Sequence, residues 1–341
     1  MTANENRDGS IIRKQSGKRN SSDIKDYSQY VHSTPEQLEK LHKRKDELYQ
    51  DINLNFWEEP TAKIHWIPVE DGEIRVVHIK PNNRKSKRPV IFISGWQAMP
   101  YQFADVYKIF HERVEVYFVE TREKYTSKIP KRKTDFSLSQ KAKDVQNTIN
   151  YFNLQDKDFV LFGTCWGATV ILQGLLDGTL KAPTICIFSP MHKLWFNEFI
   201  LKVIVPFIPG FVVGILMKIL SRVIFLGEKA KTQKNRMELT VREGVGWKWK
   251  RAARAARNLE LFGKLEAIHE EILVISGTHD RVHKAYDYPR FADELPNGRF
   301  FHFGIEEYER EMFMGVLLYE LSLTSAGKTP ELFSIFEKEI K

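Results

Sequence analysis

The fold is decided by the stretch Phe159-Val160-Leu161-Phe162-Gly163-Thr164-Cys165-Trp166-Gly167-Ala168-Thr169-Val170. It begins as a short apolar strand and continues as a helix, with a glycine two residues on either side of Cys165. Glycines at this spacing permit a sharp, strained turn between strand and helix. The turn would place Cys165 at a helix N-terminus, where the backbone dipole favours a thiolate. The Trp166 N–H group could then face a developing oxyanion, a geometry that suits acyl transfer.

Five other short apolar runs lie along the chain, mostly separated by segments long enough for a helix: residues 89–94, 114–119, 184–188, 272–276 and 299–303. Continuous Val, Ile and Phe runs are typical of strands that are buried on both faces. Alternation of such strands with helices favours right-handed crossovers and a parallel sheet. The sequence therefore predicts an α/β protein with a mostly parallel, doubly wound sheet.

The region before these runs has a different pattern. Residues 63–69 and 73–79 alternate apolar and polar side chains and are joined through Glu70-Asp71-Gly72, a strong signal for a tight hairpin turn. Upstream, Thr34-Pro35-Glu36-Gln37 has the form of a capping box, and it predicts a helix within residues 33–60 that runs to about Gln50. Residues 1–32 are polar and are predicted to be a disordered tail.

The length of 341 residues and an apolar content of 42% are typical of one globular core with an insertion. About 80 residues separate the runs that end at Phe188 and begin at Ile272, far more than an ordinary crossover needs. We therefore expect a helical cap insertion at residues 191–270, between two core segments at 61–190 and 271–341.

The composition indicates in which compartment the protein is expected and which partners are not expected. The only two cysteines, Cys165 and Cys186, lie in apolar runs, and no apolar signal segment is present, so a reducing, cytoplasmic compartment is expected. The formal net charge of +8 includes basic clusters at 84–88, 128–133 and 248–257, which are typical of a solvated surface. Few aromatic residues interleave with them, so nucleic acid is not an expected partner.

Several stretches resemble the α/β-hydrolases. Residues 163–167 are similar to the family's nucleophile elbow, Gly-x-Ser-x-Gly, with Cys165 in place of serine, as in dienelactone hydrolases and polyester synthases. Glu120-Thr121-Arg122-Glu123-Lys124-Tyr125-Thr126-Ser127 resembles the family's Asp-x-Arg-Gly-x-Gly-x-Ser segment without its two glycines. Ser94-Gly95-Trp96-Gln97 is similar to the family's His-Gly loop, and this implies that the Trp96 N–H group is a second oxyanion donor.

The resemblance also implies an acid and a base. Gly277-Thr278-His279-Asp280 is similar to the family's Gly-x-x-Asp, whose carboxylate orients the catalytic imidazole. The family's Gly-His after the last strand is missing, because Gly304 is followed by Ile305. His302 is the nearest candidate base, and His279 and His283 are alternatives. A fourth possibility is a pocket that binds a ligand without cleaving it.

The insertion contains an apolar segment at 194–226 that is broken by Pro206, Pro209 and Gly210. A spanning helix needs about 20 uninterrupted apolar residues, so two shorter helices joined by a turn are expected. In α/β-hydrolases the cap roofs the active site, which implies a pocket for apolar acyl chains; simple core packing is the plainer interpretation. Trp247-Lys248-Trp249-Lys250-Arg251, with Arg254 and Arg257, suggests peripheral membrane contact through residues 194–257.

The leading hypothesis is a hydrolase or acyltransferase that acts on an ester or thioester with an apolar acyl group. Cys165 would attack the carbonyl of a small-molecule or lipid-like substrate, and no cofactor or metal is expected. The alternative is a non-catalytic protein on the same scaffold that binds lipid-like ligands or a membrane surface. An imidazole within hydrogen-bond reach of the Cys165 sulfur would favour the enzyme.

Overall fold

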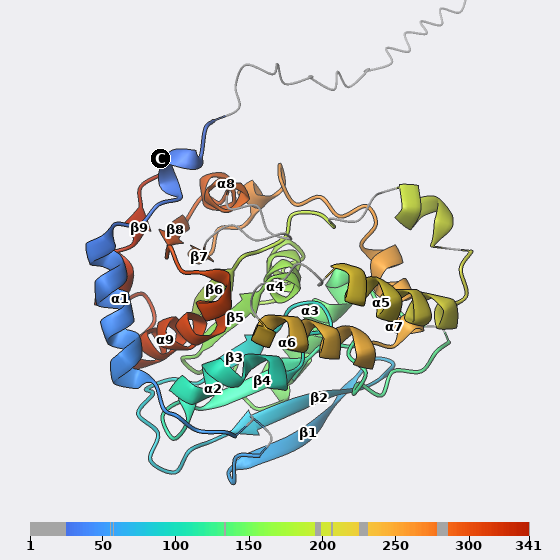
Figure 1. Cartoon of the computed structure of the whole chain (residues 1–341), viewed down its shortest axis with the longest axis horizontal. Helices are drawn as coiled ribbons and strands as arrows, with labels where there is room; N and C mark the ends of the chain where they lie inside the picture. Colours follow the sequence, from blue (N-terminus) through green and yellow to red (C-terminus); the bar gives the residue numbers. More distant parts are fainter. Residues whose placement is uncertain are drawn as a thin grey trace, which may run out of the picture.

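The computed structural model describes residues 25–54, 56, 58–132, 134–194, 199–205, 207–224, 231–277 and 286–340. Its centre is a nine-stranded sheet in the order β1-β2-β4-β3-β5-β6-β7-β8-β9 (Figure 1). The strands are β1 (Ala62–Val69), β2 (Gly72–Ile79), β3 (Val90–Ile93), β4 (Val116–Glu120), β5 (Val160–Thr164), β6 (Thr184–Phe188), β7 (Ile272–Ser276), β8 (Gly298–His302) and β9 (Glu337–Lys338).

The six strands from β3 to β8 pair in parallel and form the middle of the sheet, as predicted. β3, β4, β5 and β7 are buried along their whole length, because helices cover both faces of the sheet. In register, Ile93 of β3 lies beside Gly163 of β5. The loops that leave the carboxyl ends of these neighbouring strands therefore meet at one edge.

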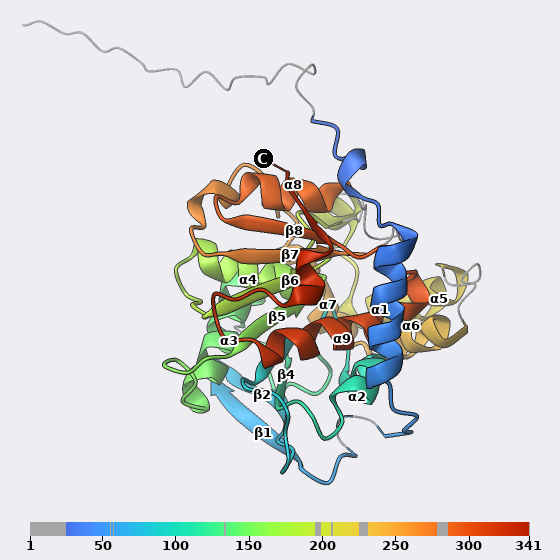
Figure 2. The ribbon, with the colours of Figure 1, turned by 90° about the vertical axis from the view of Figure 1, so that its left-hand side faces the viewer.

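Ten helices are described: α1 (Pro35–Leu48), α2 (Ala104–Phe110), α3 (Leu138–Tyr151), α4 (Trp166–Leu176), α5 (Gly210–Ile224), α6 (Lys231–Glu243), α7 (Gly246–Ala255), α8 (Asp287–Glu294), α9 (Arg310–Leu323) and α10 (Glu331–Ser334). One core cluster joins α3, α4 and α8 to one face of the sheet. A second joins α1, α2 and α9 to the other face (Figure 2). The arrangement is the predicted doubly wound α/β sandwich.

The antiparallel start of the sheet is also as predicted. β1 and β2 form a hairpin through Glu70 and Asp71, with Gly72 as the first residue of β2, and β2 pairs antiparallel with β4. A Cβ atom on Gly72 would lie 2.3 Å from the Lys128 carbonyl oxygen, so the close approach of that chain requires glycine here. The short strand β9, antiparallel to β8, was not predicted from the sequence.

The N-terminal region differs in extent from the prediction. The Thr34–Gln37 capping box is present, but α1 ends at Leu48, and residues 49–54 are irregular. Most of the predicted tail, residues 1–24, lies outside the described residues. Residues 25–32 do not fit a disordered tail, because the Tyr27 hydroxyl donates to Asp293 Oδ2 at 2.8 Å and Lys25 forms an ion pair with Asp293.

Helices α5, α6 and α7 lie between β6 and β7 in the sequence, within the segment expected to form a cap (Figure 1). A π-helical turn, Ile200–Ile204, precedes them. We call this turn and the three helices the cap. The turn ends before the prolines and α5 begins after them, as predicted. Cβ atoms on Gly210 and Gly246 would clash with α7 and α5 respectively, so glycines allow these two helices to pack closely. Among the described residues, no helix is long and apolar enough to cross a membrane.

Candidate active site

Cys165 forms the turn between β5 and α4. Its backbone has φ +53° and ψ −115°, a conformation that costs energy for any residue with a side chain. The Cys165 N–H group donates to the Phe188 carbonyl at 2.9 Å, and the Thr169 N–H group donates to the Cys165 carbonyl at 3.2 Å. These bonds hold the strained residue at the N-terminus of α4, in the conformation expected of a nucleophile elbow.

The glycines on either side of Cys165 are sterically required. A Cβ atom on Gly167 would lie 2.1 Å from the Ile93 carbonyl oxygen, and one on Gly163 would lie 2.6 Å from the Ala168 nitrogen. Both distances are shorter than non-bonded atoms can approach. The Gly-x-Cys-x-Gly pattern therefore follows from the close packing of α4 against β3 and β5.

The Cys165 side chain is half-buried, and its sulfur lies 3.4 Å from the sulfur of Met191, which follows β6. The Thr169 hydroxyl holds Met191 in place, since it donates to the Met191 carbonyl at 2.8 Å. Cys186, within β6, is fully buried, and burial raises the pKa of its thiol. Of the two cysteines, Cys165 is the one with access to solvent.

The Gly95–Trp96 peptide lies beside Cys165. A Cβ atom on Gly95 would be 3.3 Å from the Cys165 Cβ and 3.7 Å from its sulfur. Among the described residues, the Trp96 N–H group makes no backbone hydrogen bond. Trp166 is the first residue of α4, where N–H groups have no partner within the helix. Of the two predicted oxyanion donors, Trp166 thus follows Cys165 directly in the chain, and the Gly95–Trp96 peptide lies beside Cys165 in space.

The loop after β3 is tightly folded. Ser94, at the position of the family's histidine, donates its hydroxyl proton to the Ala98 carbonyl at 2.7 Å, and Gln97 adopts φ +54°. The indole nitrogens of Trp96 and Trp166 and the amide nitrogen of Gln97 are buried with no hydrogen-bond partner within the described ranges. Buried donors without acceptors are rare, and here they gather beside the elbow.

A cluster of buried lysines underlies this loop, which the sequence did not lead us to expect. Lys124 is fully buried, and its ammonium group donates to the Gly95 carbonyl oxygen. Lys248 of α7 donates to the carbonyls of Lys124 at 2.7 Å and Ser127 at 2.6 Å. Lys141 of α3 lies 3.5 Å from the Glu123 carboxylate, with its nitrogen 5.0 Å from the centre of the Trp166 ring.

Lys124, Lys141 and Lys248 outnumber Glu123, and the other nearby carboxylates, Glu120 and Asp144, are paired with Arg75 and Arg122, so the cluster carries a positive balance. Loss of hydration lowers the pKa of Lys124 and of Lys248 to about 8. Burial alone would raise the pKa of Glu123, but the attraction of Lys141 and Lys124 holds it below its ordinary value. The net effect is a positive potential next to the elbow, in a region of low dielectric constant.

The segment after β4 explains how this cluster arises. Arg122 makes a bidentate ion pair with Asp144 of α3, with both bonds at 2.7 Å, and its carbonyl accepts from Ser127 at 2.7 Å. These contacts hold residues 120–127 in a compact turn, although the two glycines of the family's similar segment are absent here. Glu123 stands in place of the first glycine and supplies the carboxylate. In the sequence, the adjacent charged residues Glu123 and Lys124 follow the buried strand β4, and this was the available signal for the cluster.

His302, the predicted base, is the last residue of β8 and is buried. Its Nδ1 lies 2.9 Å from the Ser276 hydroxyl, and burial lowers its pKa to about 4. β6 and β7 lie between β5 and β8, which places the two strands about 14 Å apart at the usual spacing. The structure does not pair His302 with Cys165, and its role as the base stays a prediction.

The other predicted members of the site, Asp280, His279 and His283, lie outside the described residues. His192 follows Met191 and was not considered from the sequence, but its ring is bonded to Glu260 at 3.1 Å and lies 3.5 Å from Asp287. Among the described residues, no group of three or more His, Cys, Asp or Glu side chains could hold a metal ion.

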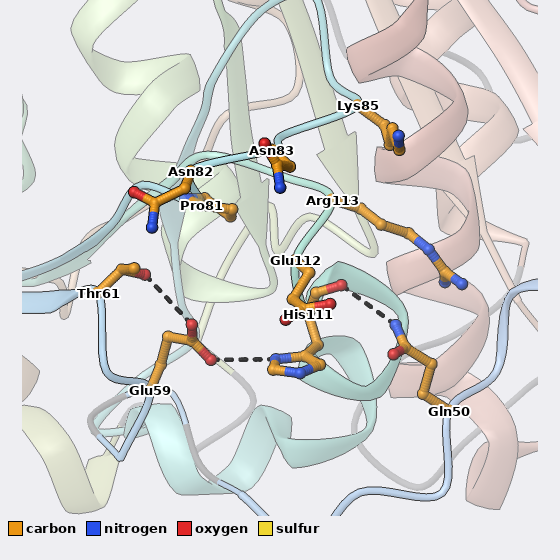
Figure 3. Close-up of a pocket in the computed structure, with 10 residues that line it drawn as sticks. All are labelled: Gln50, Glu59, Thr61, Pro81, Asn82, Asn83, Lys85, His111, Glu112 and Arg113. Carbon is orange, nitrogen blue, oxygen red and sulfur yellow. Dashed lines mark hydrogen bonds and ion pairs between the residues drawn. The ribbon is translucent and has the colours of Figure 1, made fainter.

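A polar cavity of about 380 Å³ lies elsewhere, at the end of the molecule that carries the amino ends of β3 and β4 (Figure 3). Within it, Glu59 accepts from Thr61 at 3.3 Å and contacts His111 Nδ1 at 3.0 Å. Cys165 follows the carboxyl end of β5, and the strands are parallel, so this cavity is at the opposite edge of the sheet. Its polar groups bond to one another, and it contains none of the predicted site residues.

Solved structures share this architecture. An esterase from Exiguobacterium antarcticum aligns with a TM-score of 0.60 and 18% identity over 74% of this chain and 97% of that one. The enol-lactonase from Burkholderia xenovorans LB400 aligns with a TM-score of 0.59 and 14% identity, over 75% of this chain and 99% of that one. No protein-family model matches the sequence, and no curated protein matches it significantly. From its sheet, its elbow and these likenesses, the chain has the α/β-hydrolase fold.

Proposed function

We propose that the protein is a hydrolase or acyltransferase that uses Cys165 to attack an ester or thioester carrying an apolar acyl group. The observation that carries the proposal is the strained conformation of Cys165 at the start of α4, with φ +53°. A backbone strain of this kind persists only where surrounding contacts enforce it, and such strain is concentrated at functional sites.

In the proposed reaction, the Cys165 thiolate forms a bond to the carbonyl carbon, and the carbonyl electron pair moves to oxygen. The N–H groups of Trp96 and Trp166 donate to this oxyanion. Collapse of the intermediate breaks the bond to the alcohol or thiol, which leaves with a proton, and a thioester remains on Cys165. Attack by water or by another acceptor releases the acyl group and restores the thiol.

Lys124 is assigned as a positioning residue for this step. Its ammonium group donates to the Gly95 carbonyl oxygen, which also accepts from the Ala98 N–H group at 3.1 Å. In a trans peptide the N–H group points away from the carbonyl oxygen, so these bonds direct the Trp96 N–H group away from the lysine cluster. The buried charge also favours negative charge on the nearby oxyanion and on the Cys165 sulfur.

An apolar acyl group fits the surroundings of the elbow. The Trp96 ring lies 4.6 Å from that of Trp166 and 6.0 Å from that of Trp249 on α7, measured between centroids. The cap thus contributes an aromatic wall above the Gly95–Trp96 loop. The neighbouring structures include esterases and an enol-lactonase, and their names are in keeping with an ester substrate.

The test is turnover of p-nitrophenyl esters and acyl thioesters of increasing chain length by the wild-type protein, Cys165→Ala and Cys186→Ala. We expect Cys165→Ala to abolish turnover and Cys186→Ala to retain it if the fold survives. Mass spectrometry of the quenched reaction should find the acyl group on Cys165. Turnover that survives Cys165→Ala would refute the assignment.

A non-catalytic protein that binds lipid-like ligands is the second candidate. The observation that favours it is the position of His302, which lies on β8, separated from β5 by two strands, and is hydrogen-bonded to the Ser276 hydroxyl at 2.9 Å. This candidate predicts binding of fatty acids or acyl esters with no acylation of Cys165 and no turnover. The ester assay and a fluorescent fatty-acid titration on the same preparation separate the two.

A further inference from the structure

The outer surface of the cap is apolar and exposed. Of the fourteen large apolar side chains that are exposed among the described residues, nine lie in one short segment: Phe199, Ile200, Val203, Ile204, Phe207, Phe211, Ile215, Leu216 and Ile219. We call these nine residues the cap surface. Phe207 is 84% exposed and Phe211 72% exposed. Such a concentration of exposed apolar side chains marks an interaction site.

Helical spacing places these side chains away from the core. Phe211, Ile215 and Ile219 recur every four residues and therefore share one face of α5. Another face of α5 is already occupied, because Val213 is buried and Gly214 lies against Gly246 of α7. The cap surface is thus a second apolar face, and packing against the described residues does not account for it.

Within residues 199–224, which carry the cap surface, the charged residues are of one sign. Residues 199–224 contain three basic residues, Lys202, Lys218 and Arg222, and no acidic residue. Lys202 and Lys218 are exposed. Apolar side chains flanked by cations match the interface of an anionic bilayer, where hydrocarbon receives the former and phosphate the latter. We propose that the cap surface docks the protein on membranes that contain anionic phospholipid.

The proposed membrane contact lies within the segment that the sequence indicated, residues 194–257, but at a different place from the Trp247–Arg251 stretch. Trp247 and Trp249 pack against the core cluster, and Lys248 is buried among backbone carbonyls, so these three residues of α7 face inward. The Lys250 ammonium donates to the Ile208 carbonyl at 2.6 Å, which ties α7 to the turn before α5. Helix α7 therefore supports the cap, and the proposed contact lies on the residues before and within α5.

Docking would also orient the candidate active site. Helix α7 contacts the loop after β3, since the ring centroid of Trp249 lies 6.0 Å from that of Trp96. Figure 1 shows α5 beside α7, at the side of the molecule far from α1. Because α7 links the elbow loop to α5, docking through α5 would fix the orientation of the elbow relative to the bilayer.

The experiment is flotation with vesicles of phosphatidylcholine, with and without phosphatidylserine, using the full chain. We expect the wild type to float with phosphatidylserine vesicles, and Phe207→Ser/Phe211→Ser to bind at least about tenfold more weakly because hydrocarbon burial is lost. Lys202→Glu/Lys218→Glu should weaken binding about fivefold or more per lysine at low salt. Ile64→Ser/Tyr308→Ser, which removes exposed apolar side chains elsewhere, is the matched control and should bind as the wild type does.

Binding is read out without turnover, so the result does not depend on the role of Cys165. Absence of wild-type binding to either vesicle, or equal binding by Phe207→Ser/Phe211→Ser, would overturn the proposal. Light scattering on the same samples addresses the competing occupant. A concentration-dependent dimer that Phe207→Ser/Phe211→Ser abolishes, with no flotation of the wild type, would assign the surface to self-association instead. Circular dichroism checks that each variant is folded.

Discussion

The elbow around Cys165 and the cap surface are both rich in apolar residues, but they are built in opposite ways. At the elbow, neighbouring backbone atoms leave no room beside Gly163 and Gly167, and even a methyl group on Gly167 would overlap Ile93. On the cap surface, side chains as large as Phe207 extend into solvent. Changes at the elbow should therefore act on folding and chemistry, whereas changes on the cap surface should act on a partner.

The largest effect is expected from Gly167→Ala. The added Cβ atom would lie 2.1 Å from the Ile93 carbonyl oxygen, and both groups are backbone, so neither can move without disturbing β3 or α4. We expect the free energy of unfolding to fall by about 3 kcal/mol or more, measured by urea denaturation.

The matched change on the cap is Gly214→Ala. A Cβ atom there would lie 3.7 Å from its nearest neighbour in Gly246, an ordinary contact, and alanine is the better helix former. We expect a gain of up to about 1 kcal/mol in the free energy of unfolding. Equal losses at the two glycines would contradict the contrast between elbow and cap.

His302 should make the protein sensitive to acid. Its pKa is lowered to about 4 from an ordinary value of 6.5, chiefly by burial, so the unfolded chain takes up the proton more readily than the folded one. The contribution of His302 to the free energy of unfolding is therefore present in full above about pH 6.5. It is lost as the pH falls towards 4, by about 3 kcal/mol at most. His302→Gln, which can still bond to Ser276, should flatten this dependence in denaturation series at several pH values.

The same variant bears on the predicted base. If His302 takes the proton in the reaction, His302→Gln should lower kcat by at least about a hundredfold. Turnover at the wild-type rate would assign the base to another group.

Lys124→Met should lower kcat by about tenfold with little change in KM, because the Gly95–Trp96 peptide loses the charge that positions its N–H group in the transition state. Lys248→Met is the control from the same cluster, since Lys248 bonds to Lys124 and Ser127 but not to Gly95. Both variants should lose stability, measured by thermal unfolding. A purely structural role for Lys124 would give the two variants the same kcat.

The smallest effect is expected from the cap surface. Phe207→Ser/Phe211→Ser should change the free energy of unfolding by less than about 0.5 kcal/mol, because both side chains are largely exposed. A loss of several kcal/mol would mean that these residues belong to the core of the cap. Urea denaturation without vesicles provides the measurement.

Much of the scaffold could be predicted because its signals are local. The Glu70-Asp71-Gly72 hairpin connection, the Thr34–Gln37 capping box and the apolar runs of β3 to β8 each depend on residues close in sequence, and each appears in the structure. β9 could not be predicted, because its two residues are defined only by their pairing with Phe300 and Phe301. The order of residues 25–32 likewise has no local signal, since Tyr27 is held by Asp293, which is distant in sequence.

For the site, the sequence by itself determined the elbow, because a strand, a helix and two glycines within a few residues leave Cys165 only one kind of turn. Only the tertiary structure decided what surrounds it. Lys124, Lys141 and Lys248 come from a loop and two helices, and on composition alone each would be assigned to the solvated surface. The lysines are buried because Glu123 and backbone carbonyls replace the hydration that their ammonium groups lose. The cap surface is exposed because α7 already packs against the inner face of α5. Such compensation depends on groups far apart in sequence, so a local pattern does not reveal it.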